Sequence, residues 1–445
     1  MTALAATGLV GCGGNGSVAS DAAGGVDAGD EVTGDAHTHD RPPLLAGSEQ
    51  VCKLLSNLDT SDPTANDVQH RANVLGADLG ISVDHGGQLY IFFGDTIGYA
   101  GIWGSGESHP DSVGYATDPT SAVIADPALL CGGLRIVTLP ANASIGPGID
   151  PAIAADFAAG AMAAPDGHTL DEYIRNPSGP PSNRFANLPG DFEVPSGAFS
   201  YAGSIYVFYT TVVGPGDVTM KGSYLARWAS PSTTAIPAYD IQYAIDERFD
   251  AAGPLRGDFI NIAAEVEGDH VYLFGTGAYR ASPVHLARKE LATLSSPAGF
   301  EAYDPQSGQW VAQGSQAAPL FGPAGFGETS VRYFPELGWW MFLGEELQPT
   351  SNRIVARFAE RPEGPWSDPI VVHDMADPAF TGAYCCAVDN QCAGKQFFNC
   401  DRTGFYGTYL LPGAQVHGDG SFTVHYTMSS FDPYNVAVYS TTFMP

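Results

Sequence analysis

The chain has 445 residues, of which 44% are hydrophobic, so it can bury one large core or two cores of medium size. Its 49 acidic residues against 19 basic ones give a formal net charge of −30, which would repel a phosphate backbone and argues against a nucleic-acid partner. Charged residues make up only 15%, whereas glycine (54) and proline (33) are abundant, and this favours many short strands over long helices.

The first twelve residues resemble a bacterial lipoprotein signal. An apolar run ends in Leu9-Val10-Gly11-Cys12, and the cysteine of such a signal is lipidated after cleavage. No Lys or Arg precedes the run, so the usual basic segment is missing, and an ordinary apolar N-terminus is the alternative. Residues 13–48 contain no aromatic residue and are rich in Gly, Ala, Asp and Thr, which predicts a flexible linker. We expect an extracytoplasmic protein that meets a membrane only through a lipid on Cys12.

The number and the spacing of the cysteines are consistent with an exported protein. Six remain beside Cys12, and four of them lie within one short segment. Because adjacent cysteines rarely bond to each other, we expect Cys385 and Cys386 to reach Cys392 and Cys400 in one order or the other. Cys52 is then left to pair with Cys131. A zinc site is the alternative for the four-cysteine segment, but its spacing lacks paired C-x-x-C knuckles, and disulfides are expected in an oxidising compartment.

Five aromatic-rich strands recur along residues 49–445, and an acidic segment usually precedes each of them. They are residues 88–95, 203–210, 270–276, 338–345 and 421–427. Recurrence of one unit at tens of residues indicates a repeat architecture, and β units with a turn before each strand indicate propeller blades. The sequence therefore predicts an all-β fold, a five-bladed β-propeller with a flexible N-terminal tether. Further strands are expected at residues 223–228, 283–288, 353–358 and 434–439.

An insertion is expected after the first blade. Residues 141–189 are rich in Pro, Ala and Gly and contain a short helical pattern at residues 170–175. We expect this segment to cover one face of the propeller.

Paired acids mark the expected hairpins of two blades. If the first hairpin turns between residues 85 and 86, Asp78 lies nearly opposite Asp95, and the turn at residues 335–338 similarly places Glu328 opposite Glu345. Like charges on directly opposed residues destabilise a sheet and raise one carboxyl pKa, as a general acid requires. Acids at strand ends that simply face water are the alternative.

Two carboxylates that flank a glycosidic bond are the minimum for its hydrolysis. We therefore interpret Asp78 and Asp95 as catalytic, with Glu328 as a reserve acid. The expected substrate-binding residues are Asp191 and Asp258, which precede the second and third aromatic strands, together with Arg332 and Trp103. The five acids are expected at one end of the propeller axis. Trp339 and Trp340 could stack on sugars, with core packing as the alternative. No Gly-x-Ser-x-Gly elbow or phosphate-binding glycine loop is present.

Several segments resemble the family catalogued as domain of unknown function 4185. They are Ala77–Ile81, Leu89–Thr96, Gly327–Trp340 and Gly364–Pro369, and the resemblance spans roughly residues 70–440. Some members of that family form glycoside hydrolase family 183, the endo-D-arabinanases, in which an early pair of aspartates is catalytic. The resemblance implies this role for Asp78 and Asp95. The four-cysteine segment and the long insertion depart from the arabinanase pattern.

These observations predict an exported, lipid-anchored, monomeric glycoside hydrolase that cuts a furanose-containing polysaccharide such as arabinan, with inversion and without a cofactor. A non-catalytic surface propeller that binds glycan or protein is the alternative. A third interpretation is an adhesion module in which the acids hold a structural calcium ion.

Overall fold

The computed structural model describes fourteen stretches of the chain, and all structural statements below concern them. They are residues 41–55, 74–98, 111–137, 173–175, 188, 190, 192–213, 219–234, 237–247, 255–312, 317–348, 351–387, 392–431 and 433–445. These residues are nearly all β, as the composition predicts. The described helical elements are short: α2 (Thr120–Ala125), α3 (Ala128–Gly133), η2 (Leu291–Thr293) and α5 (Pro378–Tyr384).

The described strands form five antiparallel meanders. The first contains β3 (Leu79–His85), β4 (Gln88–Phe93), β6 (Ser112–Pro119) and β7 (Leu134–Ile136). The second contains β9 (Phe192–Tyr201), β10 (Ser204–Val213), β11 (Thr219–Trp228) and β12 (Ala238–Glu247). The third contains β13 (Asn261–Glu267), β14 (His270–Thr276), β15 (Ser282–Glu290), β16 (Glu301–Asp304) and β17 (Gln309–Ala312). The fourth contains β18 (Phe321–Phe334), β19 (Trp339–Gln348), β20 (Ser351–Ala359) and β21 (Ile370–Asp374).

The fifth meander joins the two ends of the described chain. It contains β22 (Tyr406–Val416), β23 (Phe422–Phe431), β24 (Tyr434–Met444) and, at its outer edge, β1 (Leu44–Leu55). The register runs from Leu44 opposite Met444 to Leu55 opposite Val436. The ordered part therefore begins before residue 49, where the linker was expected to end. Residues 44–48 belong to β1 because they complete a sheet whose other three strands lie at the opposite end of the sequence.

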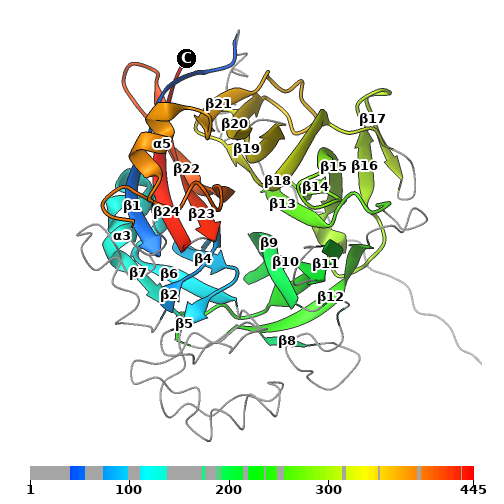
Figure 1. The fold of residues 1–445 in the computed structure, drawn as a ribbon. Helices are drawn as coiled ribbons and strands as arrows, with labels where there is room; N and C mark the ends of the chain where they lie inside the picture. The colour runs from blue at the N-terminus through cyan, green and yellow to red at the C-terminus, as the bar shows by residue number, and fades with distance from the viewer. Residues whose placement is uncertain are drawn as a thin grey trace, which may run out of the picture. The chain divides into compact units, whose positions relative to one another are not determined.

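The first strands of the meanders follow one another around a ring (Figure 1). β3 contacts β9, β9 contacts β13, β13 contacts β18, β18 contacts β22, and β22 returns to β3. Among the described strands, no sheet closes on itself through hydrogen bonds, although a short β15–β18 ladder joins the third and fourth meanders. The ring is held instead by five apolar clusters, each packed between neighbouring meanders. One example joins Ile81 and Phe92 to Val207, and another joins Met341 to Tyr426.

The five aromatic strands predicted from the sequence are the second strands of the meanders, β4, β10, β14, β19 and β23. Their alternate side chains fill the clusters on both faces, which explains why they are so continuously hydrophobic. Trp339 and Trp340 are 7% and 1% exposed and belong to two of these clusters, so core packing is the correct interpretation for both. The expected third strands correspond to β11, β15, β20 and β24.

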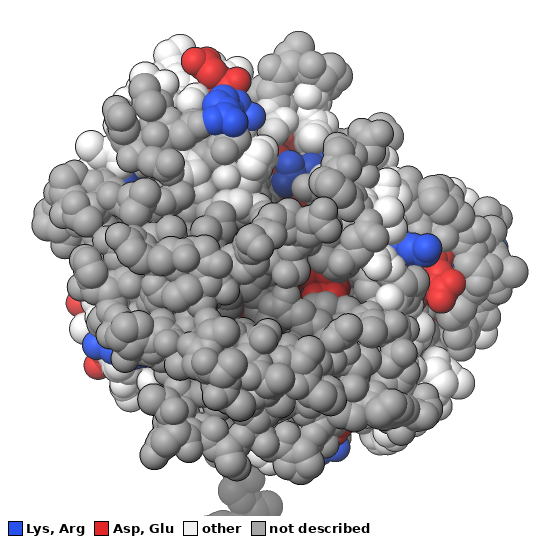
Figure 2. Space-filling model, turned by 60° about the horizontal axis from the view of Figure 1, so that its bottom comes forward, with Lys and Arg blue, Asp and Glu red and all other residues white. Residues whose placement is uncertain are grey.

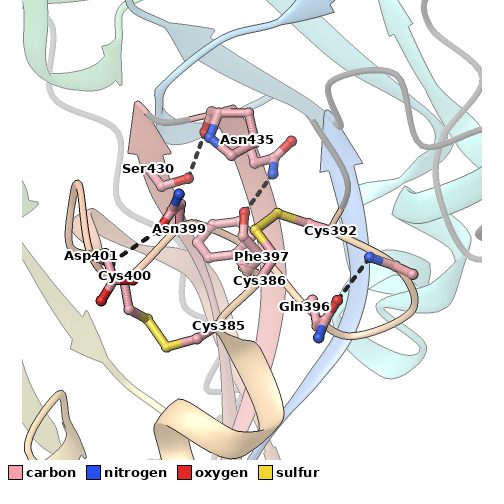
Figure 3. The surroundings of a disulfide bond; sticks show 12 residues. Cys385, Cys386, Cys392, Gln396, Phe397, Asn399, Cys400, Asp401, Ser430 and Asn435 are labelled. Atoms are coloured by element: carbon pink, nitrogen blue, oxygen red, sulfur yellow. Dashed lines mark hydrogen bonds between the residues drawn. A yellow bond between two sulfur atoms is a disulfide. The ribbon is translucent and has the colours of Figure 1, made fainter. Parts of the chain in front are cut away.

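Three disulfides match the predicted pairing. Cys52 bonds to Cys131 and so links β1 to α3. Within the four-cysteine segment, Cys385 bonds to Cys400 and Cys386 bonds to Cys392, which settles the order that the sequence left open (Figure 3).

Other expectations fall at the margin of the described chain. The prediction of a short helix at residues 170–175 is wrong for the three residues that are described, because β8 (Tyr173–Arg175) is a strand that pairs in parallel with β12. Cys12 and most of the insertion lie outside the described residues. Among the helices that are described, none has the length and apolar character needed to cross a membrane. The two remaining strands, β2 (Val74–Gly76) and β5 (Ile97–Gly98), pair with each other.

Candidate functional site

A cavity of about 230 Å³ is lined by residues that lie in or next to all five meanders. Its lining combines three acids, one arginine, four aromatic side chains and an apolar side, namely Asp78, Asp95, Glu328, Arg280, Tyr279, Tyr406, Phe431, Tyr434, Leu79, Val194, Val212 and Met220. Figure 2 shows acidic side chains at the bottom of a hollow near the middle of the face that it draws. The cavity therefore brings carboxylates and aromatic rings together, as a sugar-binding site requires.

Asp78 is a buried acid at the entrance of β3. Its side chain is 7% exposed, and its Oδ2 accepts a hydrogen bond of 2.6 Å from the Tyr406 hydroxyl. Burial raises the pKa of Asp78 well above its ordinary value, and the negative charge of Asp95 adds to the effect, while the Tyr406 hydrogen bond opposes it. The surroundings of Asp78 thus favour its protonated form more than those of an ordinary aspartate do.

Asp95 lies just beyond the end of β4 and lines the same cavity. Its Oδ2 accepts a hydrogen bond of 2.8 Å from the Tyr434 hydroxyl. Each of the two aspartates on the first meander is therefore held by a tyrosine from the fifth.

The two aspartates lie nearly opposite each other, as expected, although the turn is centred one residue further along the chain than predicted. The hairpin turns at Gly86-Gly87, so that His85 faces Gln88, and a bulge between Leu79 and Ile81 then shifts the pairing by one residue. The Gly94 N–H consequently donates to the Asp78 carbonyl, and Asp95 falls one position further along. Strict alternation of side chains ends with the strand at Phe93, so Asp95 still reaches the cavity that Asp78 lines.

Arg280 connects two further acids at this site. Its Nη2 lies 3.2 Å from Oε2 of Glu328, and its Nε lies 3.4 Å from Oε2 of Glu345. The guanidinium also lies over the Tyr406 ring, 4.7 Å from the centroid. Glu328 lines the cavity, whereas Glu345 is fully buried behind it and accepts a bond of 3.1 Å from Asn352.

The electrostatics of Glu345 and Arg280 are linked. Burial raises the pKa of Glu345 to about 7; the nearby Arg280 charge opposes this rise and the Glu328 charge adds to it. Burial would lower the pKa of Arg280, but the charges of Glu328 and Glu345 outweigh it and hold that pKa well above its usual range. The predicted register of this hairpin is correct from Phe334 opposite Trp339 to Thr329 opposite Gly344, and a register shift between Phe326 and Thr329 then interrupts the ladder at Glu328.

Two of the other predicted site residues, Arg332 and Asp258, are described and do not line the cavity. Arg332 pairs with Glu265 at 3.1 Å among the first strands and does not line the cavity. Asp258 lies 3.8 Å from His285 and is also absent from the cavity wall. Asp191 and Trp103 lie outside the described residues. Of the five acids expected together, the structure thus brings Asp78, Asp95 and Glu328 to one cavity.

Sequence reasoning missed Tyr406, Tyr434, Tyr279 and Arg280. The two tyrosines begin β22 and β24, where aromatic residues also serve the core, so no local pattern separates them. Arg280 sits in the connection between β14 and β15 with a φ of 51°, and only its three-dimensional neighbours reveal it. In the described part of the chain, no three His, Cys, Asp or Glu side chains gather as metal ligands would.

Comparison with solved structures shows a similar chain path in proteins of low sequence identity. A presumed hydrolase from Bacteroides ovatus ATCC 8483 is 14% identical, with a TM-score of 0.50 over 84% of this chain and 87% of that one. A GH62 alpha-L-arabinofuranosidase catalytic domain from Coprinopsis cinerea is 12% identical, with a TM-score of 0.43 over 90% and 97% of the two chains. An arabinanase from Bacillus subtilis is 10% identical, with a TM-score of 0.38 over 82% and 96%. The last two similarities are too weak to carry an argument.

The curated proteins contain no significant match to this chain. The family model described as "Domain of unknown function (DUF4185)" matches residues 188–440, which is more than half of the 445 residues. The match includes Glu328, Arg280, Tyr406 and Tyr434 and begins after Asp78 and Asp95. The resemblance noted from the sequence is confirmed, and the chain belongs to the DUF4185 family.

Proposed function

We propose that this protein is a glycoside hydrolase that acts on a furanose-containing polysaccharide such as arabinan. The observation that carries the proposal is the pair of aspartates in one cavity, one of which, Asp78, has a strongly raised pKa. Acid–base hydrolysis of a glycosidic bond requires two carboxyl groups, one of which carries the proton. Four aromatic rings in the wall provide surfaces for sugar rings.

In this proposal Asp78 holds the proton and donates it to the leaving-group oxygen. Asp95, which is less buried, activates a water on the other side of the anomeric carbon. Glu328 is held by Arg280 and remains the reserve acid. Inversion is the expected outcome, and the anomeric form of the first product tests it by proton NMR.

Two variants test these roles separately. Asp78→Asn and Asp95→Asn should each lower the hydrolysis of arabinan by several orders of magnitude. An acid variant keeps activity on an aryl arabinofuranoside with a good leaving group, because such a group departs without a proton. A base variant is instead rescued by added azide, which gives a glycosyl azide. Opposite behaviour of the two variants would exchange the roles, and near-native activity of either one would remove that residue from the mechanism.

The family resemblance and the five meanders also support two broader proposals. The first is that the fold is a five-bladed β-propeller in which each meander is one blade. The second is that the protein is an exported monomer anchored through a lipid on Cys12. The three disulfides support an oxidising location. Metabolic labelling with a fatty-acid analogue, compared between the parent and Cys12→Ala, tests the anchor. Binding of arabinan without cleavage would favour a glycan-binding propeller instead.

A further inference from the structure

We propose that Tyr406 and Tyr434 are positioning residues that fix the carboxylates of Asp78 and Asp95, and that the disulfide-bridged segment 385–400 in turn sets the place of both tyrosines. The catalytic part of this inference rests on the proposed function. The geometric part does not, and it can be measured without a substrate.

The two tyrosines make matching contacts. Each is the first residue of its strand in the fifth meander, and each donates its hydroxyl to Oδ2 of one aspartate on the first meander, at 2.6 Å for Tyr406 and 2.8 Å for Tyr434. Short hydrogen bonds to a carboxylate are strong and directional. The fifth meander therefore orients both carboxylates, although the backbones of the two aspartates belong to the first meander.

For Asp78, the bond to Tyr406 engages only one of the two carboxyl oxygens, Oδ2. No described residue makes a hydrogen bond to its Oδ1, although this atom is buried. Gly94 lies against it, since a Cβ at that position would come within 2.5 Å of Oδ1. The carboxyl group is thus fixed on one side by a hydroxyl and given room on the other by the absence of a side chain.

The bridged segment reaches the neighbour of each tyrosine. Asn435, which follows Tyr434 and is 2% exposed, donates from Nδ2 to the Phe397 carbonyl at 2.6 Å (Figure 3). Phe405, which precedes Tyr406, is fully buried and packs against Phe398 with ring centroids 6.2 Å apart. Phe397 and Phe398 lie in the loop closed by the Cys385–Cys400 bridge, after Cys392 of the second bridge. The Cys385–Cys400 disulfide therefore closes the loop whose residues contact the neighbours of both tyrosines.

The segment is itself fixed by further bonds to its own ends. The Phe397 N–H donates to the Tyr384 carbonyl at 2.6 Å, and the Cys386 N–H donates to the Phe398 carbonyl at 2.9 Å. Tyr384 ends α5, so the helix, the segment and the two strand starts form one connected support. A support of this kind restricts the sideways movement of a hydroxyl that a flexible strand end would allow.

The first test measures the proton on Asp78 directly. Carboxyl titration by NMR, with 13C-labelled aspartate and Asp78→Asn for assignment, compares the parent with Tyr406→Phe. The Tyr406 hydrogen bond lowers the pKa of Asp78, so its removal should shift the Asp78 midpoint upward by about one pH unit. Phenylalanine keeps the ring over which Arg280 lies, so the cation–π contact is retained.

Tyr243→Phe is the matched control. It also removes a partly buried hydrogen bond, which the Tyr243 hydroxyl donates to the Leu294 carbonyl at 2.8 Å, and neither residue lines the cavity. The control should leave the Asp78 midpoint unchanged. An unshifted Asp78 midpoint in Tyr406→Phe, or an equal shift in the control, overturns the role of Tyr406.

The second test asks whether Asn435 acts through Tyr434. On an arabinan that the parent cleaves, Tyr434→Phe should lower kcat tenfold or more with little change in KM, and Asn435→Ala should lower it less. The double variant should be no slower than Tyr434→Phe, because a residue that acts only through another adds nothing once that residue is gone. Independent, multiplying losses would overturn the role of the segment.

The two tests separate the possible failures. If the Asp78 midpoint shifts but no glycan is cleaved, the positioning role stands and the proposed function falls. If glycan is cleaved and the midpoint does not move, the proposed function stands and the positioning role falls. Under the proposed acid role, the basic limb of kcat/KM in Tyr406→Phe should shift upward with the midpoint.

Discussion

Glu345 should make the protein less stable as the pH rises, and Glu345→Gln should remove this dependence. Its side chain is fully buried, and burial raises its pKa to about 7 in the folded state, compared with 4.5 for an ordinary glutamate. Below pH 4.5 both the folded and the unfolded state hold the proton. Between pH 4.5 and 7 the unfolded chain releases it and the folded chain keeps it, so the free energy of unfolding falls.

The size of the effect follows from the two values. A difference of about 2.5 pKa units corresponds to about 3 kcal/mol of free energy of unfolding, lost as the pH rises to and beyond 7. Glutamine has nearly the same shape, and its amide oxygen can still accept the bond of 3.1 Å from Asn352. The substitution also removes the ion pair with Arg280, so the prediction concerns how the difference between variant and parent changes with pH, and not its absolute size.

Urea unfolding of the full chain at pH 4.5, 5.5, 6.5, 7.5 and 8.5 measures this difference. The free energy of unfolding of Glu345→Gln, relative to the parent, should rise by about 3 kcal/mol across the series. Glu301→Gln is the control, because it removes an ion pair with Arg288 whose glutamate is 43% exposed, and its difference from the parent should stay nearly constant. A Glu345→Gln difference that is equally flat would refute the argument from burial.

Three further outcomes are expected from the backbone and the disulfides. Gly80→Ala should lower the free energy of unfolding by about 2 kcal/mol, because Gly80 has a φ of 127° and an added Cβ would lie 2.7 Å from Oγ1 of Thr427. Gly203→Ala is the matched control and should lower it less, because no atom lies within 4 Å of an added Cβ there. Replacing Cys52 and Cys131 by serine opens a loop of 79 residues and should lower the free energy of unfolding by about 4 to 5 kcal/mol. The same change at Cys386 and Cys392, six residues apart, should lower it by only about 2 kcal/mol. Equal losses in urea unfolding would contradict the loop-entropy argument. Mass spectrometry of the non-reduced protein should show the segment 385–400 with four hydrogens fewer than its reduced form, and free thiols or bound zinc there would show that the two bridges do not form.

The sequence by itself determined the strand content and the order of the strands. Aromatic runs such as residues 88–93 and 204–213 must be buried on both faces, and glycine pairs such as Gly86-Gly87, both with positive φ, can turn a two-residue hairpin. The number of cysteines, the clustering of four of them and the rule that adjacent cysteines rarely bond to each other together limited the disulfides to two arrangements. These features are local, or they depend only on residue type, so one sequence is sufficient to read them.

The tertiary structure alone decided how distant segments meet. The bulge after Asp78 depends on packing, since Gly80 lies against Thr427 of β23. Because of this bulge, the residue opposite Asp78 is Gly94 instead of Asp95. Residues 44–48 of β1 were assigned to the linker because their partner strand, β24, lies almost 400 residues away in the sequence. For the same reason, no local pattern revealed that Tyr406 and Tyr434 bond to the aspartates of the neighbouring meander or that Arg280 pairs with Glu328 and Glu345. A side chain's neighbours on other meanders are set by the closure of the ring, and no periodicity within one meander encodes them.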